Sequence, residues 1–160
     1  LNGFKKSGLL NREEDRVKVI LYPVYLNGVD GLIDLPYYDC LVGCHFGLFP
    51  SYYEPWGYTP LESAALGVPA LTTDLAGFGR FIKQDDRVSK SGIFVLDRMN
   101  IKDETIVDNF AETMYKYASL NRHQRVANKI DAKELAEEAD WSELINNYIE
   151  AHNQALAKLK

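Results

Sequence analysis

The sequence predicts an α/β fold with a parallel, doubly wound sheet, followed by additional C-terminal helices. Two observations support this fold class. Up to residue 96, short apolar runs alternate with helical patterns, which is typical of parallel strands joined by crossover helices. From Asp103 onward the pattern changes to three long amphipathic stretches. The 160 residues, 46% of them hydrophobic and 26% charged, are enough to form a core of ordinary composition.

The strands are predicted from short apolar runs that are bounded by turn signals. The first run, Val-Lys-Val-Ile-Leu-Tyr, is dominated by β-branched and apolar residues. Asn27-Gly28 and Asp30-Gly31 mark turns in the loop that follows it. The expected strands are residues 17–22, 46–49, 68–72 and 92–96.

The helices are predicted from periodicity and from the residues at their ends. Gly67 stops the second helix and Pro69 prevents its continuation. Asp140 is placed to cap the last helix, with Glu143 three residues later. The glycine-bearing segment 76–79 is expected to be a loop. The expected helices are residues 37–44, 59–66, 103–120, 122–139 and 141–159.

Composition argues against several function classes. The net charge of −5 gives no basic footprint, so nucleic acid is not an expected partner. No apolar run approaches the roughly 20 residues of a membrane helix, and no signal peptide pattern opens the chain. Cys40 and Cys44 share a helix face and are poorly placed to pair, and with His45 they make a poor metal site. We expect no metal, and a reduced, cytoplasmic protein.

The most informative segment runs from Ser51 to Glu62. It follows a predicted buried strand and opens into a predicted helix. In an open α/β sheet, a compact loop between a strand and a helix N-terminus is where nucleotides and phosphates bind. Glu54 and Glu62 bracket this loop, so the two carboxylates can meet different parts of one ligand.

Three pieces of sequence carry a family resemblance: residues 43–45 (Gly-Cys-His), 50–60, and 77–79 (Gly-Phe-Gly). They resemble the glycogen synthases of animals and fungi, retaining glucosyltransferases of the glycosyltransferase B fold with a glutamate-x7-glutamate signature. The resemblance implies that residues 1–98 form an incomplete Rossmann-like nucleotide-sugar-binding domain. It implies that residues 99–160 form a C-terminal helical segment packing on that domain.

The resemblance also implies an activity and its partners. The whole enzyme would transfer glucose from UDP-glucose to the non-reducing end of an α-1,4-glucan such as glycogen, without metal or other cofactor. The acceptor-binding N-terminal domain would lie outside this chain, the enzyme would be a homo-oligomer, and this piece alone would be inactive. The start at Leu1 rather than Met agrees with a piece of a longer protein.

Each glutamate has a functional interpretation and a structural alternative. Residues 59–62 (Thr-Pro-Leu-Glu) read as a capping box, so the Glu62 carboxylate could bond the Thr59 amide instead of a ribose hydroxyl. Glu54 precedes Pro55 and is therefore extended; it could be a solvated turn residue. The resemblance instead implies that Glu54 lies beside the transferred glucose as the catalytic carboxylate, without acting as a covalent nucleophile.

Further candidate residues surround these glutamates. Gly57, Tyr58 and Thr59 lie where backbone N–H groups converge at a helix start, so we expect the donor diphosphate there. Gly57 could also serve only the turn. The resemblance implies that Tyr37 stacks on uracil; a buried structural role for His45 is as plausible as a ligand contact. The remaining nucleotide-sugar candidates are Trp56 and Gly77.

Two alternatives to a glycogen synthase stay open. One is a different retaining glycosyltransferase of the same fold, and the other is a non-catalytic binding module. The resemblance also points to an arginine-rich helix that senses glucose 6-phosphate, but residues 121–129 hold only two arginines and a lysine. Activation by a phosphosugar is therefore not expected.

Overall fold

The computed structural model describes residues 2–84 and 92–158. Contacts divide the chain into two units between Tyr37 and Tyr38. The predicted boundary between residues 98 and 99 is a different division and stays a prediction. The first unit has one short helix, α1 (Asn2–Lys6), and otherwise consists of turns and irregular backbone.

The strand predicted at residues 17–22 is wrong. This segment forms no ladder, and the Ile20 side chain is 86% exposed. The side-chain amide of Asn11 takes the place of a strand partner, because it donates to the Val19 carbonyl at 2.6 Å and accepts from the Val19 N–H at 2.8 Å. An apolar run becomes a strand only where a neighbouring backbone completes its hydrogen bonds, and none of the described residues does so here.

The second unit is built on a three-stranded parallel sheet in the order β1-β2-β3. The strands lie within the predicted apolar runs or within one residue of them: β1 (Gly47–Leu48), β2 (Ala70–Thr73) and β3 (Ile93–Leu96). The sheet predictions for residues 46–49, 68–72 and 92–96 are therefore confirmed, and the structure has the α/β architecture that the sequence predicts.

Besides α1, which was not predicted, the helices follow the prediction closely, with one addition. Their bounds are α2 (Tyr37–Val42), α3 (Tyr58–Ala65), α5 (Asp103–Ala118), α6 (Arg122–Glu137) and α7 (Trp141–Ala157). Residue 159, the predicted end of the last helix, lies outside the described residues. The addition is α4 (Gly77–Lys83), where the glycines predict a loop. No helix within residues 2–84 and 92–158 is long and apolar enough to cross a membrane.

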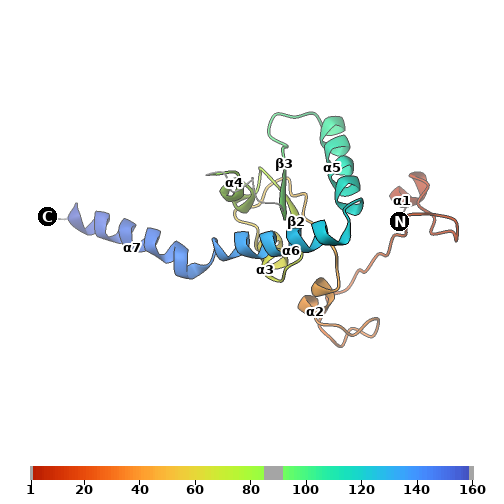
Figure 1. Ribbon diagram of the computed structural model, residues 1–160, viewed down its shortest axis with the longest axis horizontal. Helices are drawn as coiled ribbons and strands as arrows, with labels where there is room; N and C mark the ends of the chain where they lie inside the picture. The colour runs from red at the N-terminus through yellow and green to blue at the C-terminus, as the bar shows by residue number, and fades with distance from the viewer. Residues whose placement is uncertain (1, 85–91, 159–160) are drawn as a thin grey trace. The chain divides into compact units, whose positions relative to one another are not determined.

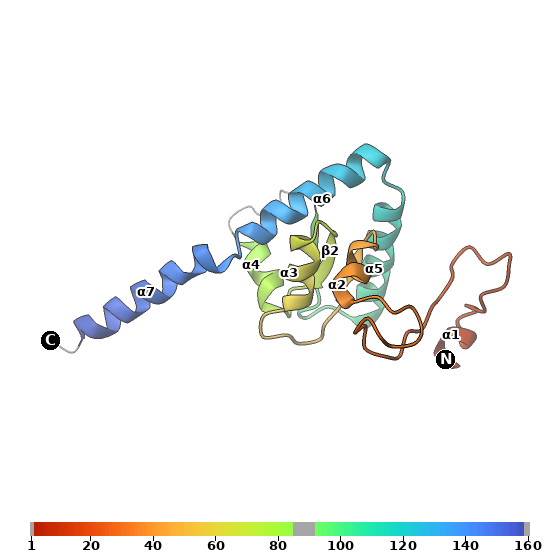
Figure 2. The ribbon, with the colours of Figure 1, turned by 90° about the horizontal axis from the view of Figure 1, so that it is seen from below.

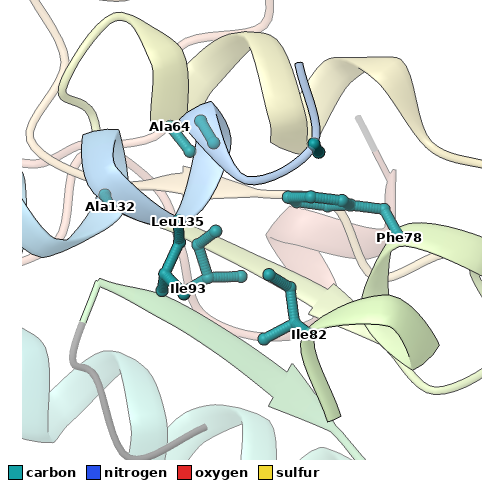
Figure 3. Packing of buried hydrophobic residues seen from close by; sticks show 8 residues of the cluster. Ala64, Phe78, Ile82, Ile93, Ala132 and Leu135 are labelled. Atoms are coloured by element: carbon teal, nitrogen blue, oxygen red, sulfur yellow. The ribbon is translucent and has the colours of Figure 1, made fainter. Parts of the chain in front are cut away.

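Side chains of β3 alternate between two apolar clusters, so helices cover both faces of the sheet. Ile93 and Val95 join the first cluster with α3, α4 and α6, whereas Phe94 and Leu96 join the second with α5. Figure 3 shows Phe78, Ile82 and Leu135 packed together with Ile93 in the first cluster. Figures 1 and 2 show α6 alongside α3, in agreement with the contacts between them. Helix α6 therefore packs on the sheet.

The two last helices begin at caps that the side chains provide. Asn121 and Gln124 form a reciprocal capping box at α6, with bonds of 3.0 and 2.9 Å. The predicted cap of α7 is confirmed: the Asp140 carboxylate accepts from the Ser142 N–H at 2.8 Å. The side-chain hydrogen bond to Ser142 lowers the pKa of Asp140. Each cap bonds one of the first backbone amides of its helix and thereby stabilises the helix start.

Candidate functional site

The carboxyl ends of the three parallel strands meet at one edge of the sheet, and the loop from Phe49 to Gly57 starts there. This loop follows β1 and leads directly into α3. Backbone hydrogen bonds hold it mainly to the segment that follows β2 and includes the first residues of α4. Strand, loop and helix N-terminus therefore have the arrangement that the sequence predicts, and this edge is where open α/β sheets bind ligands.

Glu54 is anchored through its backbone at this edge. It forms an isolated parallel bridge with Ala76: its N–H donates to Leu75 O at 3.3 Å, and its carbonyl accepts from the Gly77 N–H at 3.1 Å. Its side chain is half-buried, and its Cγ lies against Gly57, 3.4 Å from the place of a Cβ on that glycine. The backbone of Glu54 is thus fixed, and its side chain extends beside the N-terminus of α3.

Glu62 lies one turn into α3, and its carboxylate does not cap that helix. The capping box predicted at residues 59–62 is wrong, because the N-cap is Gly57, with φ 108°, and no side chain bonds the first amides. A left-handed N-cap moves the helix start before Thr59, which removes Thr59 from the capping position. Instead, Oε1 of Glu62 accepts a hydrogen bond of 3.1 Å from the Tyr38 hydroxyl. This bond raises the pKa of Tyr38, as does the negative charge of the carboxylate.

The first turn of α3 carries the residues expected to face a diphosphate. Gly57 is buried and has a backbone conformation that favours glycine, whereas Tyr58 and Thr59 are exposed. The amides of the first helical turn have no intrahelical acceptors and point out of the helix end. This end of α3 can therefore bind an anion, and Glu54 lies next to it.

Trp56 and Gly77 have well-defined structural surroundings. The half-buried Trp56 ring packs on Phe78 and Phe81, with centroids 5.9 and 5.7 Å away, and its carbonyl accepts from the Phe78 N–H at 2.7 Å. A Cβ on Gly77 would clash with the Pro55 carbonyl oxygen and lie 3.1 Å from Trp56 Cα. Both residues fix the loop that carries Glu54. A contact of Trp56 or Gly77 with the nucleotide sugar stays a prediction.

His45 lies apart from this loop, and Tyr37 belongs to the first unit. His45 precedes β1, so it is at the amino end of that strand, opposite the edge where Glu54 lies. It lines a hollow of about 580 Å³ with Tyr117 and Arg125, and its carbonyl accepts from the Tyr117 hydroxyl at 2.7 Å. Tyr37 belongs to the first unit, where its N–H donates to Leu26 O at 3.0 Å. Its predicted stacking on uracil stays a prediction.

Sequence reasoning missed Thr73 and Arg98, which hold the Glu54 loop from the other strands, and Asp74, which holds Arg98. The Thr73 hydroxyl donates to Ser51 O at 2.9 Å, and Nη1 of Arg98 donates to Pro50 O at 2.9 Å. Asp74 accepts from the Arg98 N–H at 2.8 Å. The sequence held a signal for these residues: each is polar and lies at or just after the end of a predicted parallel strand. The carboxyl ends of parallel strands converge at one edge of the sheet.

The described residues include no group of three or more His, Cys, Asp or Glu side chains that could hold a metal ion. Cys40 and Cys44 are free thiols, and the Cys44 thiol donates to the Cys40 carbonyl at 3.5 Å. The candidate site around the Glu54 loop consists of carboxylates, a helix N-terminus and aromatic side chains. Such groups bind a polar organic ligand by hydrogen bonds and charge.

Comparison with known proteins agrees with the resemblance read from the sequence. A family model described as glycogen synthase matches residues 1–160. The chain is 40% identical over 161 residues to "Glycogen [starch] synthase" of Caenorhabditis elegans. This match covers 99% of the chain and 24% of that protein. It is 35% identical to isoform 1 of Saccharomyces cerevisiae, with 99% and 23% covered, and 35% identical to the liver protein of Mus musculus, also with 99% and 23% covered. The chain thus spans about a quarter of the length of the curated relatives it matches.

Proposed function

Because the chain belongs to the glycogen synthase family, we propose that it is the nucleotide-sugar-binding part of an enzyme that elongates an α-1,4-glucan. The whole protein transfers glucose, with retention, from UDP-glucose to the non-reducing end of glycogen. The observation that carries this proposal is the position of Glu54, bonded at the sheet edge beside the N-terminus of α3. A sugar and its diphosphate need these two features side by side.

The role proposed for Glu54 is electrostatic. As the bond between glucose and diphosphate breaks, positive charge develops at the anomeric carbon, and a fixed carboxylate nearby stabilises it. The backbone of Glu54 is bonded on both sides, to Leu75 and Gly77, which limits the movement of this charge. Glu54 is the catalytic residue of the proposal but forms no covalent bond, and the leaving phosphate helps to deprotonate the acceptor hydroxyl.

The role proposed for the start of α3 is to hold the diphosphate. The free amides of residues 57–59 and the positive end of the helix dipole both favour an anion. Gly57 has no side chain to obstruct the approach of the phosphate to this backbone. The exposed Thr59 hydroxyl, which caps nothing, is available as a further donor.

The remaining residues complete the donor site. Glu62 accepts hydrogen bonds from the ribose, an interpretation supported by the loss of its capping alternative. Tyr37 stacks on uracil, whereas His45, at the amino end of β1, stands outside this site and its ligand contact stays a prediction. Trp56 and Gly77 border the site through the loop that they support.

The proposal extends to the parts that the chain does not contain. The three-stranded sheet would form part of a doubly wound, Rossmann-like domain of the glycosyltransferase B fold. A second domain of the same protein would bind the glucan, and the enzyme would be a homo-oligomer that needs no metal or other cofactor. A cytoplasmic location is supported by the two free thiols, which persist in a reducing compartment.

Kinetics of the whole protein carrying Glu54→Gln test the function. We expect kcat for glucosyl transfer to fall at least about 100-fold, while affinity for UDP changes less than about threefold. The control is Glu14→Gln, an exposed glutamate of the first unit, which should behave as wild type. Equal turnover of Glu54→Gln and wild type would reject the catalytic role.

Donor choice separates this function from its alternatives. UDP-glucose should be used in preference to ADP-glucose and GDP-mannose. A preference for another donor would indicate a different retaining glycosyltransferase of the same fold. Binding of a nucleotide sugar without transfer to any glucan would indicate a non-catalytic binding module.

A further inference from the structure

Arg98 links the Glu54 loop to the end of β3. It is two residues beyond that strand and its side chain is only 9% exposed. Nη1 donates to the carbonyl of Pro50 at 2.9 Å, and the guanidinium carbon lies 3.7 Å from the centre of the Tyr52 ring. One side chain therefore holds two residues of the segment that leads to Glu54.

The Arg98 side chain starts from a backbone that is itself held in place. Oδ1 of Asp74 accepts from the Arg98 N–H at 2.8 Å, and Oδ2 accepts from the Met99 N–H at 3.3 Å. The Asp74 N–H donates in turn to the Leu96 carbonyl at 3.1 Å. These bonds join the ends of β2 and β3, so Arg98 reaches the loop from a rigid base.

A second side chain from the sheet reaches the same loop. The hydroxyl of Thr73, a fully buried residue, donates to the Ser51 carbonyl at 2.9 Å and accepts from the Leu75 N–H at 3.3 Å. The carbonyls of Pro50 and Ser51 are thus both bonded by side chains of other strands. All three strand ends contribute to the position of one loop.

The loop has little apolar packing of its own at this point. Tyr52 and Tyr53 are 74% and 78% exposed, so burial contributes little to their positions. A guanidinium suits this place because its edge donates hydrogen bonds while its face stacks on an aromatic ring. A lysine ammonium keeps the charge but cannot do both with one planar group.

We propose that Arg98 is a positioning residue, which sets the place of the Glu54 carboxylate by holding Pro50 and Tyr52. This inference rests on the proposed function, in which Glu54 acts on the transferred glucose. The bonds to Leu75 and Gly77 hold the backbone of Glu54 itself, and Arg98 holds Pro50 and Tyr52 in the segment before it. Release of that segment lets the loop shift and changes the place of the carboxylate relative to α3.

The expected consequence is a change in turnover rather than in donor binding. Electrostatic stabilisation depends on the distance between the carboxylate and the developing charge, so a small displacement costs much of it. The proposed contacts to UDP come from α3 and Tyr37 and do not involve Pro50 or Tyr52. Disturbing Arg98 should therefore lower kcat and leave the KM for UDP-glucose almost unchanged.

The test compares two loop variants with one control in the whole protein. Arg98→Lys keeps the charge and removes the planar group, and Tyr52→Leu removes the ring of a residue that is 74% exposed. The control is Arg80→Lys, because the exposed Arg80 also donates to a backbone carbonyl, that of Asp74, at 2.9 Å. We measure kcat and KM for UDP-glucose, and deuterium uptake of the peptide covering residues 50–57 by mass spectrometry.

We expect Arg98→Lys to lower kcat at least about tenfold, Tyr52→Leu to lower it less, and KM to change less than about threefold. Deuterium uptake at residues 50–57 should rise in Arg98→Lys and stay at the wild-type level in Arg80→Lys.

Unchanged uptake in both loop variants would overturn the inference, whatever the activity. If wild type lacks transferase activity, the proposed function fails, while the uptake measurement still decides whether Arg98 holds the loop. If wild type is active and Arg98→Lys has the kcat of Arg80→Lys, the inference alone fails.

Discussion

The hydroxyl of Tyr38 donates a hydrogen bond of 3.1 Å to Oε1 of Glu62 and thereby joins α2 to α3. The carboxylate is oriented by a neighbouring helix and not by the first turn of its own helix. Nucleotide binding and helix capping, which a capping box would combine in one side chain, are therefore separable at Glu62. This separation makes the role of Glu62 directly measurable.

Glu62→Ala should weaken UDP binding without a matching loss of stability. A hydrogen bond from a ribose hydroxyl to a carboxylate contributes about 1.5–3 kcal/mol, so affinity should fall at least about tenfold. The free energy of unfolding should change by no more than about 0.5 kcal/mol, because no cap is lost and Tyr38 is an exposed residue. Titration calorimetry and urea denaturation measure the two quantities. A stability loss of 1 kcal/mol or more, on the order of a lost cap, with unchanged affinity would support the capping alternative.

Tyr38→Phe should give a smaller effect of the same kind. The variant keeps the ring and removes the donor that orients the Glu62 carboxylate, so UDP affinity should fall about two- to fivefold. Tyr25→Phe is the matched control, since Tyr25 is 92% exposed. Equal affinities of the two variants in titration calorimetry would show that Glu62 needs no orientation by α2.

Gly77→Ala should disturb both stability and turnover. The added methyl group would clash with the Pro55 carbonyl, and relief requires movement of the segment that carries Glu54. Overpacking of this kind costs about 1–3 kcal/mol of unfolding free energy. Gly3→Ala is the control, because nothing lies within 4 Å of its added Cβ. Urea denaturation and kcat of both variants check the prediction, and a Gly77→Ala protein with wild-type values would contradict the geometry of this loop.

The sheet of the second unit was predictable from sequence because its central strand is fully buried and its neighbours are apolar. Residues 70–73 are fully buried, so their run is apolar or small and lies between turn signals. The run at residues 17–22 has the same composition but lacks a partner strand among the described residues, and composition alone does not reveal that. Pairing between distant segments decides which apolar run becomes a strand.

The helix α4 was missed for a related reason. Gly77 and Gly79 predict a loop, yet both permit close packing: a Cβ on Gly79 would clash with the Thr73 carbonyl. A glycine thus marks either chain freedom or the close approach of another backbone, and only the fold distinguishes the two. The predicted Thr59 cap failed similarly, since the left-handed conformation of Gly57 sets the helix start.

The site was only partly predictable. The position of Glu54 at the carboxyl edge follows from the order of strand, loop and helix along the chain. The bond from Arg98 to Pro50 joins residues that are 48 positions apart, and no local pattern identifies such a pair. Residues that bind a ligand leave local signals, whereas those that hold the binding loop are found from three-dimensional contacts.

Tyr117→Phe should destabilise the second unit at neutral pH. The Tyr117 side chain is nearly buried; its ring stacks on Phe46, with centroids 4.2 Å apart, and its hydroxyl donates to the His45 carbonyl at 2.7 Å. The variant keeps the stacking and loses the bond, which costs about 1 kcal/mol of unfolding free energy. Tyr115→Phe, on the same helix and 74% exposed, should cost almost nothing.

The same residue predicts a pH dependence with a definite sign. Burial raises the pKa of Tyr117 above its usual value of 10.0, while the charge of Arg125 acts in the opposite direction. Because the folded protein disfavours the phenolate, the contribution of Tyr117 is complete below pH 10 and is lost as the pH rises through the raised pKa. As the pH rises above 10.0, urea denaturation should therefore show a steeper loss of stability for wild type than for Tyr117→Phe. Parallel curves for the two proteins would mean that Tyr117 titrates alike in the folded and unfolded chains.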